Sequence, residues 1–88
     1  MNAYKTLTKE MLSAYADTLR RSRRLTQEKM AESLRISSRA YSDLERGKHC
    51  FSTITLLFLL LILKEEERKE LLDTFQSRVD ALENSDAA

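Results

Sequence analysis

The apolar positions after Thr26 follow the spacing of a short helix. Met30 and Ala31 are adjacent and lie four and three positions before Leu34, so the three side chains share one helix face that can be buried. Thr26 precedes this segment and is a typical N-cap residue, because its hydroxyl can accept a hydrogen bond from a free backbone N–H group. The pattern therefore predicts a short helix that begins after Thr26 and ends near Leu34.

A second short helix is expected after an interruption of about three or four residues. Ser37 or Ser38 supplies its N-cap, and Gly47 ends it, since glycine favours the left-handed conformation found after helix C-termini. Its apolar stripe consists of Ala40, Tyr41 and Leu44. Two short helices joined by a tight turn form a helix-turn-helix, here over about residues 26–46, whose second helix can enter the major groove of DNA.

Longer helices are expected on both sides of this motif. Upstream, Thr8 is the expected N-cap of a helix that runs to about Arg23. Its inner face consists of Leu12, Tyr15, Ala16 and Leu19. Downstream, Ser52 or Thr53 caps a helix that contains the apolar run Leu56–Leu63. This run covers only about 12 Å, whereas a bilayer needs about 20 residues, so no membrane partner is expected and protein must cover the run.

The C-terminal part predicts an amphipathic helix over about residues 65–83. Its apolar stripe has the spacing of paired helices and consists of Leu72, Phe75, Val79 and Leu82. The stripe can fold back over Leu56–Leu63 within one chain or pair with the helices of a second chain, and both can coexist in a two-fold homodimer. Residues 84–88 are expected to form a frayed tail.

The composition agrees with one all-α domain of five helices over residues 1–88. The chain has no proline and one glycine, which favours helices over strands. A chain of 88 residues is near the lower limit of independent stability, so dimerisation is a natural source of further burial. The N-terminal residues lack the apolar segment of a signal peptide, and together with the single cysteine this leads us to expect a cytoplasmic protein.

Candidate chemistry other than binding is sparse. His49 and Cys50 are adjacent, but one residue of each type does not make a zinc site, so we expect no metal and no cofactor. His49 has no nucleophile or carboxylate partner at a motif spacing, and the chain has no glycine-rich phosphate loop. We therefore expect no enzymatic activity.

Positive charge is concentrated in the half of the chain that holds the motif. The net charge is only +1, but residues 1–50 contain eleven Lys or Arg against six Asp or Glu, and residues 51–88 contain four against eight. Much of the positive charge lies in residues 20–24, RRSRR, directly before the motif. Such a basic helix end can contact phosphates, although it can also be a solvated helix end.

Residues 12–63 resemble the XRE, or lambda-repressor-like, family of helix-turn-helix regulators. The resemblance rests on Thr26, Gln27 and Ala31 at the first motif helix and on Glu45, Gly47 and Lys48 at the end of the second. It implies a five-helix, lambda-repressor-like DNA-binding fold, here with the amphipathic C-terminal helix in addition. It also implies an ion pair between Arg20, seven residues before Gln27, and Glu45.

The resemblance also implies which residues bind double-stranded DNA. The positions that face the bases correspond to Ser38, Arg39, Ser42 and Asp43. The positions that mostly hold the backbone correspond to Gln27, Ser37, Arg46 and Lys48. Arginine can donate two hydrogen bonds to guanine, serine can bond to most base edges, and aspartate can accept from cytosine.

Two residues depart from the family pattern. Arg35 stands in the turn where the family has a glycine in a left-handed conformation, which costs other residues about 1 kcal/mol. Tyr41 replaces a buried Val or Ile, so either the core is roomier or the phenol points to its rim.

Three hypotheses for function remain open. The first is a sequence-specific transcriptional regulator, a dimeric repressor that reads a palindromic operator. The second is a protein-interaction module that binds a partner through the last two helices, as an antitoxin binds its toxin. The third is a domain whose altered turn has ended DNA binding and that serves only in assembly.

Overall fold

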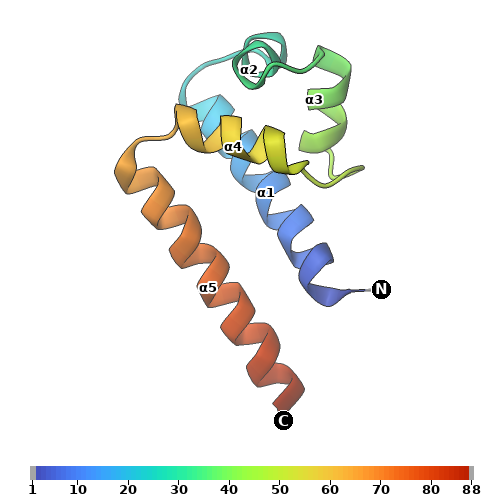
Figure 1. The fold of residues 1–88 in the computed structure, drawn as a ribbon, viewed down its shortest axis with the longest axis vertical. Helices are drawn as coiled ribbons and strands as arrows, with labels where there is room; N and C mark the ends of the chain where they lie inside the picture. Colours follow the sequence, from blue (N-terminus) through green and yellow to red (C-terminus); the bar gives the residue numbers. More distant parts are fainter. Residues whose placement is uncertain (1, 88) are drawn as a thin grey trace.

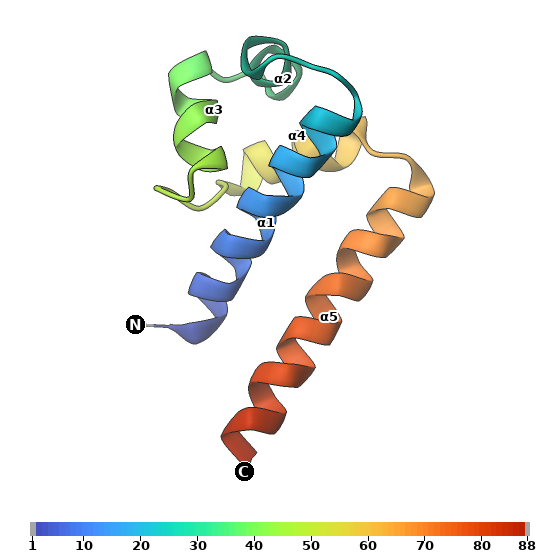
Figure 2. The ribbon, with the colours of Figure 1, turned by 180° about the vertical axis from the view of Figure 1, so that it is seen from behind.

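The computed structural model describes residues 2–87. These residues form five α-helices joined by short connections, and no strand occurs among them (Figure 1). The helices are α1 Ala3–Ser22, α2 Gln27–Leu34, α3 Ser38–Glu45, α4 Thr53–Ile62 and α5 Glu65–Ala87. The first four surround a common core, and α5 extends away from it past α1 (Figures 1 and 2). This arrangement confirms the predicted all-α class with five helices.

Side-chain oxygens cap α2, α3 and α4 at positions that the sequence predicted. The hydroxyls of Thr26, Ser37 and Ser52 accept hydrogen bonds from the third backbone N–H group after each of them, at 3.1, 3.1 and 3.2 Å. Each bond satisfies a donor that the helix itself leaves free. Of the alternatives that the sequence left open, Ser37 rather than Ser38 caps α3, and Ser52 rather than Thr53 caps α4.

Helix α1 begins earlier than predicted, and α5 ends later. Asn2, not Thr8, is the N-cap of α1, and its side chain accepts from the backbone N–H of Tyr4 at 2.9 Å. Thr8 lies within the helix, where its hydroxyl donates to the carbonyl of Tyr4. The expected frayed tail is also wrong over residues 84–87, which continue α5 as a helix, while Ala88 lies outside the described residues.

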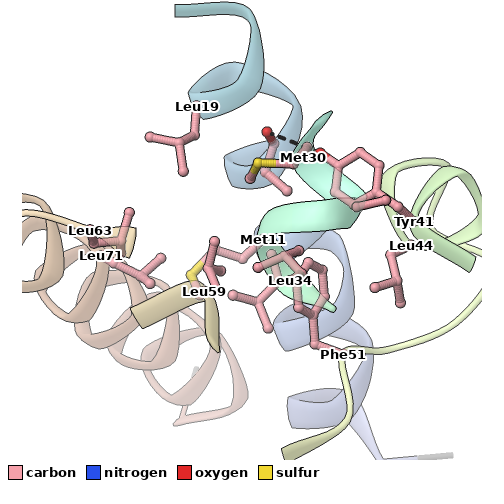
Figure 3. Packing of buried hydrophobic residues seen from close by; sticks show 13 residues of the cluster. Met11, Leu19, Met30, Leu34, Tyr41, Leu44, Phe51, Leu59, Leu63 and Leu71 are labelled. Atoms are coloured by element: carbon pink, nitrogen blue, oxygen red, sulfur yellow. Dashed lines mark hydrogen bonds between the residues drawn. The ribbon is translucent and has the colours of Figure 1, made fainter. Parts of the chain in front are cut away.

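The core collects side chains from α1, α2, α3 and α4, and α1 contributes Met11, Leu12, Ala16 and Leu19. Its largest fully buried members are Met30, Leu34, Tyr41 and Leu59 (Figure 3). Tyr41 is 0% exposed, and its hydroxyl donates to the backbone carbonyl of Ala16 at 3.4 Å. The core therefore admits the phenol completely, and the alternative that it points to the rim is wrong.

Helix α5 folds back along α1 rather than over α4 (Figure 2). Leu71 is buried, Phe75, Val79 and Leu82 are half-buried, and the hydroxyl of Tyr4 donates to Glu83 at 2.7 Å near the far end. Leu72 is 65% exposed, so within the chain the neighbouring Leu71 rather than Leu72 is the buried residue at this end of the stripe. The intrachain arrangement thus uses α1 as the partner of most of the stripe.

One side of α4 remains uncovered. Ile54, Leu57 and Leu61 lie three and four residues apart on the face opposite the buried Thr55 and Leu59, and they are 64, 55 and 70% exposed. No helix among the described residues is both long and apolar enough to cross a membrane.

Candidate nucleic-acid interface

The turn between α2 and α3 has the conformation expected of a helix-turn-helix. Arg35 ends α2 in a left-handed conformation with φ 59° and ψ 40°, the conformation in which the family has a glycine. Its guanidinium lies 4.5 Å from the ring centroid of Phe58 on α4, and its Nη1 donates to the carbonyl of Ser33 at 2.8 Å. These contacts fasten the strained turn to its neighbours and offset part of the conformational cost.

The turn leaves one side of α3 open to solvent. Ser38 and Arg39 in its first turn are exposed, and Ser42 one turn later is half-buried, whereas Tyr41 and Leu44 on the opposite side are buried. No ion pair or hydrogen bond of the Arg39 side chain occurs among the described residues. The exposed side therefore presents a free guanidinium flanked by two hydroxyls, which are groups that can donate to base edges.

A buried ion pair fixes α3 against α1. The Nε and Nη2 atoms of Arg20 donate to the two carboxylate oxygens of Glu45 at 2.9 and 3.0 Å, and Nη1 donates to the carbonyl of Leu25. The side chains of Arg20 and Glu45 are only 13 and 7% exposed. This two-point contact has the strong bidentate geometry of arginine with carboxylate, and it confirms the pairing that the resemblance implied.

Gln27 belongs to the same buried network. Its Nε2 donates to Glu45 at 3.0 Å, so the amide ties the first turn of α2 to the end of α3. Burial works against the charge of Glu45, but the hydrogen bonds from Arg20 and Gln27, together with the neighbouring Tyr41 hydroxyl, outweigh it and hold the pKa of this carboxyl at about 2. Gln27 thus positions the motif while its side chain remains half-buried at the N-terminus of α2.

Asp43 organises the cations at the C-terminal end of α3. Its carboxylate accepts from Arg46 at 2.8 Å and lies 4.0 Å from the Nζ of Lys48. The hydrogen bond from Arg46 is the main cause that lowers the pKa of Asp43. Arg46 and Lys48 remain 62 and 60% exposed, so phosphate oxygens can reach both. Asp43 and Arg46 were expected to contact DNA separately, and their pairing at a spacing of three residues, which a helix allows, was not predicted.

The basic segment 20–24 is mostly used within the chain. Arg20 is buried against Glu45, and Arg21 pairs with Asp17 at 2.8 Å. Arg23 donates to the carbonyl of Ile62 and to Glu67, at 2.9 and 2.7 Å, and so joins α1 to the α4–α5 connection. Only Arg24 is exposed without such a partner among the described residues. The expectation that some arginines of this segment contact phosphate stays a prediction for Arg24 and for Arg21, whose side chain is 69% exposed beside Asp17.

Groups of three or more residues that could together bind a metal ion do not occur among the described residues. The exposed donors of this surface are arginine, lysine and serine side chains, which suit nucleic acid.

The fold and this surface together define a helix-turn-helix DNA-binding domain. A family model described as helix-turn-helix matches residues 18–69, more than half of the chain. The chain therefore belongs to the XRE, or lambda-repressor-like, helix-turn-helix family of DNA-binding regulators. No curated protein and no solved structure matches the chain.

Proposed function

We propose that this protein is a sequence-specific transcriptional repressor that places α3 in the major groove. The observation that carries this proposal is the exposed side of α3, where the unpaired Arg39 lies between Ser38 and Ser42. Arginine contacts guanine N7 and O6 with two hydrogen bonds, and such a pair contributes about 1–3 kcal/mol of discrimination. The buried Arg20–Glu45 pair holds this side in a fixed orientation before DNA arrives.

The remaining site residues divide by role in this proposal. Ser37 is the N-cap of α3, where backbone N–H groups and the helix dipole attract a phosphate, and Gln27 is the first residue of α2, directly after its N-cap Thr26. Arg46 and Lys48 contact phosphate at the other end of α3, and the phosphate then competes with Asp43 for them. Release of Asp43 leaves its carboxylate free to accept from a cytosine N4 amino group.

We propose further that the functional unit is a homodimer joined through α4. Ile54, Leu57 and Leu61 supply the apolar surface, and Leu72 is a further exposed apolar side chain, on α5. Burial of each such side chain contributes about 1–2 kcal/mol, and a two-fold interface uses every one twice. Added over both protomers, these contributions are comparable to the entropy cost of association.

Of the stripe predicted for dimerisation, Phe75, Val79 and Leu82 already pack inside the chain. The exposed face of α4 also supports a second candidate, in which a different protein covers Ile54, Leu57 and Leu61, as in an antitoxin-like component. The two candidates differ in what is found in solution. A homodimer at micromolar concentration by light scattering supports the first, whereas a monomer that becomes a stable heterodimer with the product of a neighbouring gene supports the second.

Selection of binding sites from a pool of random duplex DNA tests the repressor proposal. A dimer that reads two half-sites should enrich a palindrome whose halves lie about one helical turn, roughly 10 base pairs, apart. Occupation of that site should block transcription from an overlapping promoter in a purified system. Recovery of no enriched sequence contradicts base reading by α3, and enrichment with increased transcription contradicts repression.

A further inference from the structure

A second basic surface lies beside the C-terminal end of α3. It is a hollow lined by Lys5, Thr6 and Lys9 of α1 and by Lys48, His49 and Cys50 of the α3–α4 connection. None of these lining residues, all within the described part of the chain, is acidic, and neither Lys5 nor Lys9 forms an ion pair with another described residue. Among the described residues, Lys5 and Lys9 therefore have no counter-ion, whereas Lys48, the third lysine of the hollow, lies 4.0 Å from the carboxylate of Asp43.

The packing of α1 against α3 determines where this hollow lies. Lys5, Lys9 and Ser13 are four residues apart, so they share one stripe of α1. Ser13 donates to the backbone carbonyl of Glu45 at 2.6 Å, at the last residue of α3. The side of α1 that contacts α3 at Ser13 therefore continues toward the N-terminus as the two lysines.

Both views of the ribbon agree with this placement. Helix α3, the connection after it and the N-terminal end of α1 follow one another down the same side of the molecule, and the start of α5 lies on the opposite side (Figures 1 and 2). Between Ser13 and Lys5, α1 rises about 12 Å. This distance corresponds to three to four base-pair steps of about 3.4 Å along DNA.

We infer that Lys5 and Lys9 form a second phosphate-binding site, which holds the DNA backbone beyond the C-terminal end of α3. The inference rests on the proposed function, because it needs α3 to lie in the major groove. A helix in that groove has a sugar-phosphate backbone beside it, and phosphate contacts fix the register in which the bases are read. Lys48 joins the two surfaces, since it lines the hollow and also belongs to the end of α3.

The salt dependence of DNA binding tests the inference. Each phosphate contact contributes about 0.9 to the slope of log K against log salt concentration, so Lys5→Gln with Lys9→Gln should make the slope shallower by about 1.8 per bound protomer. The matched control is Lys64→Gln with Lys69→Gln, which removes the same charge at the start of α5, where Lys69 pairs with Asp73. The control should leave the slope within about 0.5 of the wild type.

The single cysteine provides a second measurement on the unmodified protein. Cys50 lines the same hollow, so saturating duplex DNA should slow its alkylation by iodoacetamide at least several-fold. Equal slopes for the two double variants, or an alkylation rate that DNA does not change, would overturn the inference while base reading by α3 stands. Failure of the wild-type protein to bind any duplex would instead overturn the proposed function, and this inference with it.

Discussion

Removal of one partner from the Arg20–Glu45 pair should destabilise the domain more than removal of both. Arg20→Met leaves a carboxylate whose side chain is 7% exposed, and Glu45→Leu leaves a guanidinium that is 13% exposed and keeps only the more exposed Asp17 as an ion-pair partner, at 3.5 Å. An uncompensated charge at such depth costs about 3–5 kcal/mol, whereas replacement of both by apolar groups is often close to neutral. We therefore expect a loss of about 3 kcal/mol for each single variant and of at most about 2 kcal/mol for the double variant.

Losses of this size are measurable at pH 7 by urea unfolding and by thermal melting, with circular dichroism as the signal in both. A domain of this length loses about 4–8 °C in Tm for each kcal/mol, so each single variant should melt at least about 12 °C lower. Arg21→Met is the matched control, because Arg21 pairs with Asp17 on the surface of the same helix and is 69% exposed. It should cost less than about 1 kcal/mol. Small effects that add in the double variant would refute the reasoning.

The pH dependence of stability provides an independent check of the same pair. The pKa of Glu45 is about 2 in the folded protein, below the ordinary value of 4.5 that applies when the chain is unfolded. The unfolded chain therefore binds the proton more readily, so the pair stabilises fully above pH 4.5 and this contribution disappears as the pH falls toward 2. A shift of this size corresponds to about 3 kcal/mol. Arg20→Met should flatten this part of the pH profile.

Three further variants test the turn, the C-terminus of α3 and the α4 surface. Arg35→Gly should remain within about 0.5 kcal/mol of wild type in thermal melts, because relief of the left-handed strain offsets the lost contact with Phe58, whereas Arg35→Ala should lose about 1 kcal/mol. Gly47→Ala should cost about 1 kcal/mol for its φ of 74° alone, since the added Cβ meets only Ser13 at 3.7 Å; a loss above 3 kcal/mol would contradict this. Leu61→Asp should convert the dimer to a monomer in light scattering without lowering the helix content of the protein. The control is Thr18→Asp, which adds the same charge at an exposed residue of α1 and should leave the dimer intact.

The sequence predicted the motif well because its signals are local. Thr26, Ser37 and Ser52 cap their helices through their own side chains, and Gly47 ends α3 through its own backbone freedom, so each boundary depends on a few neighbouring residues. The start of α1 was missed although Asn2 is equally good as an N-cap residue, because Thr8 offered a competing signal nearer the apolar stripe.

Contacts between distant segments could not be predicted in the same way. Arg23 and Glu67 are 44 residues apart, and no pattern in either helix identifies the partner of the other. The position of α5 depends on which apolar surfaces α1 and α4 leave free, so the apolar stripe of α5 alone could not show which of these two helices it covers. For the same reason it could not show that Leu71 rather than Leu72 is buried. The pairing of Asp43 with Arg46 is short-range, but either residue could equally have faced DNA.

The affinity of wild type, Arg39→Ala and Lys48→Ala for a selected site and for random duplex tests the central claim most directly. If α3 reads bases, Arg39→Ala should lose about 1–3 kcal/mol on the selected site and little on random DNA, with preference lost at one base pair per half-site. Lys48→Ala should weaken both duplexes about equally and reduce the salt slope by about one. If Arg39→Ala weakens both duplexes equally and leaves the base preference unchanged, α3 does not read the sequence and the account is contradicted.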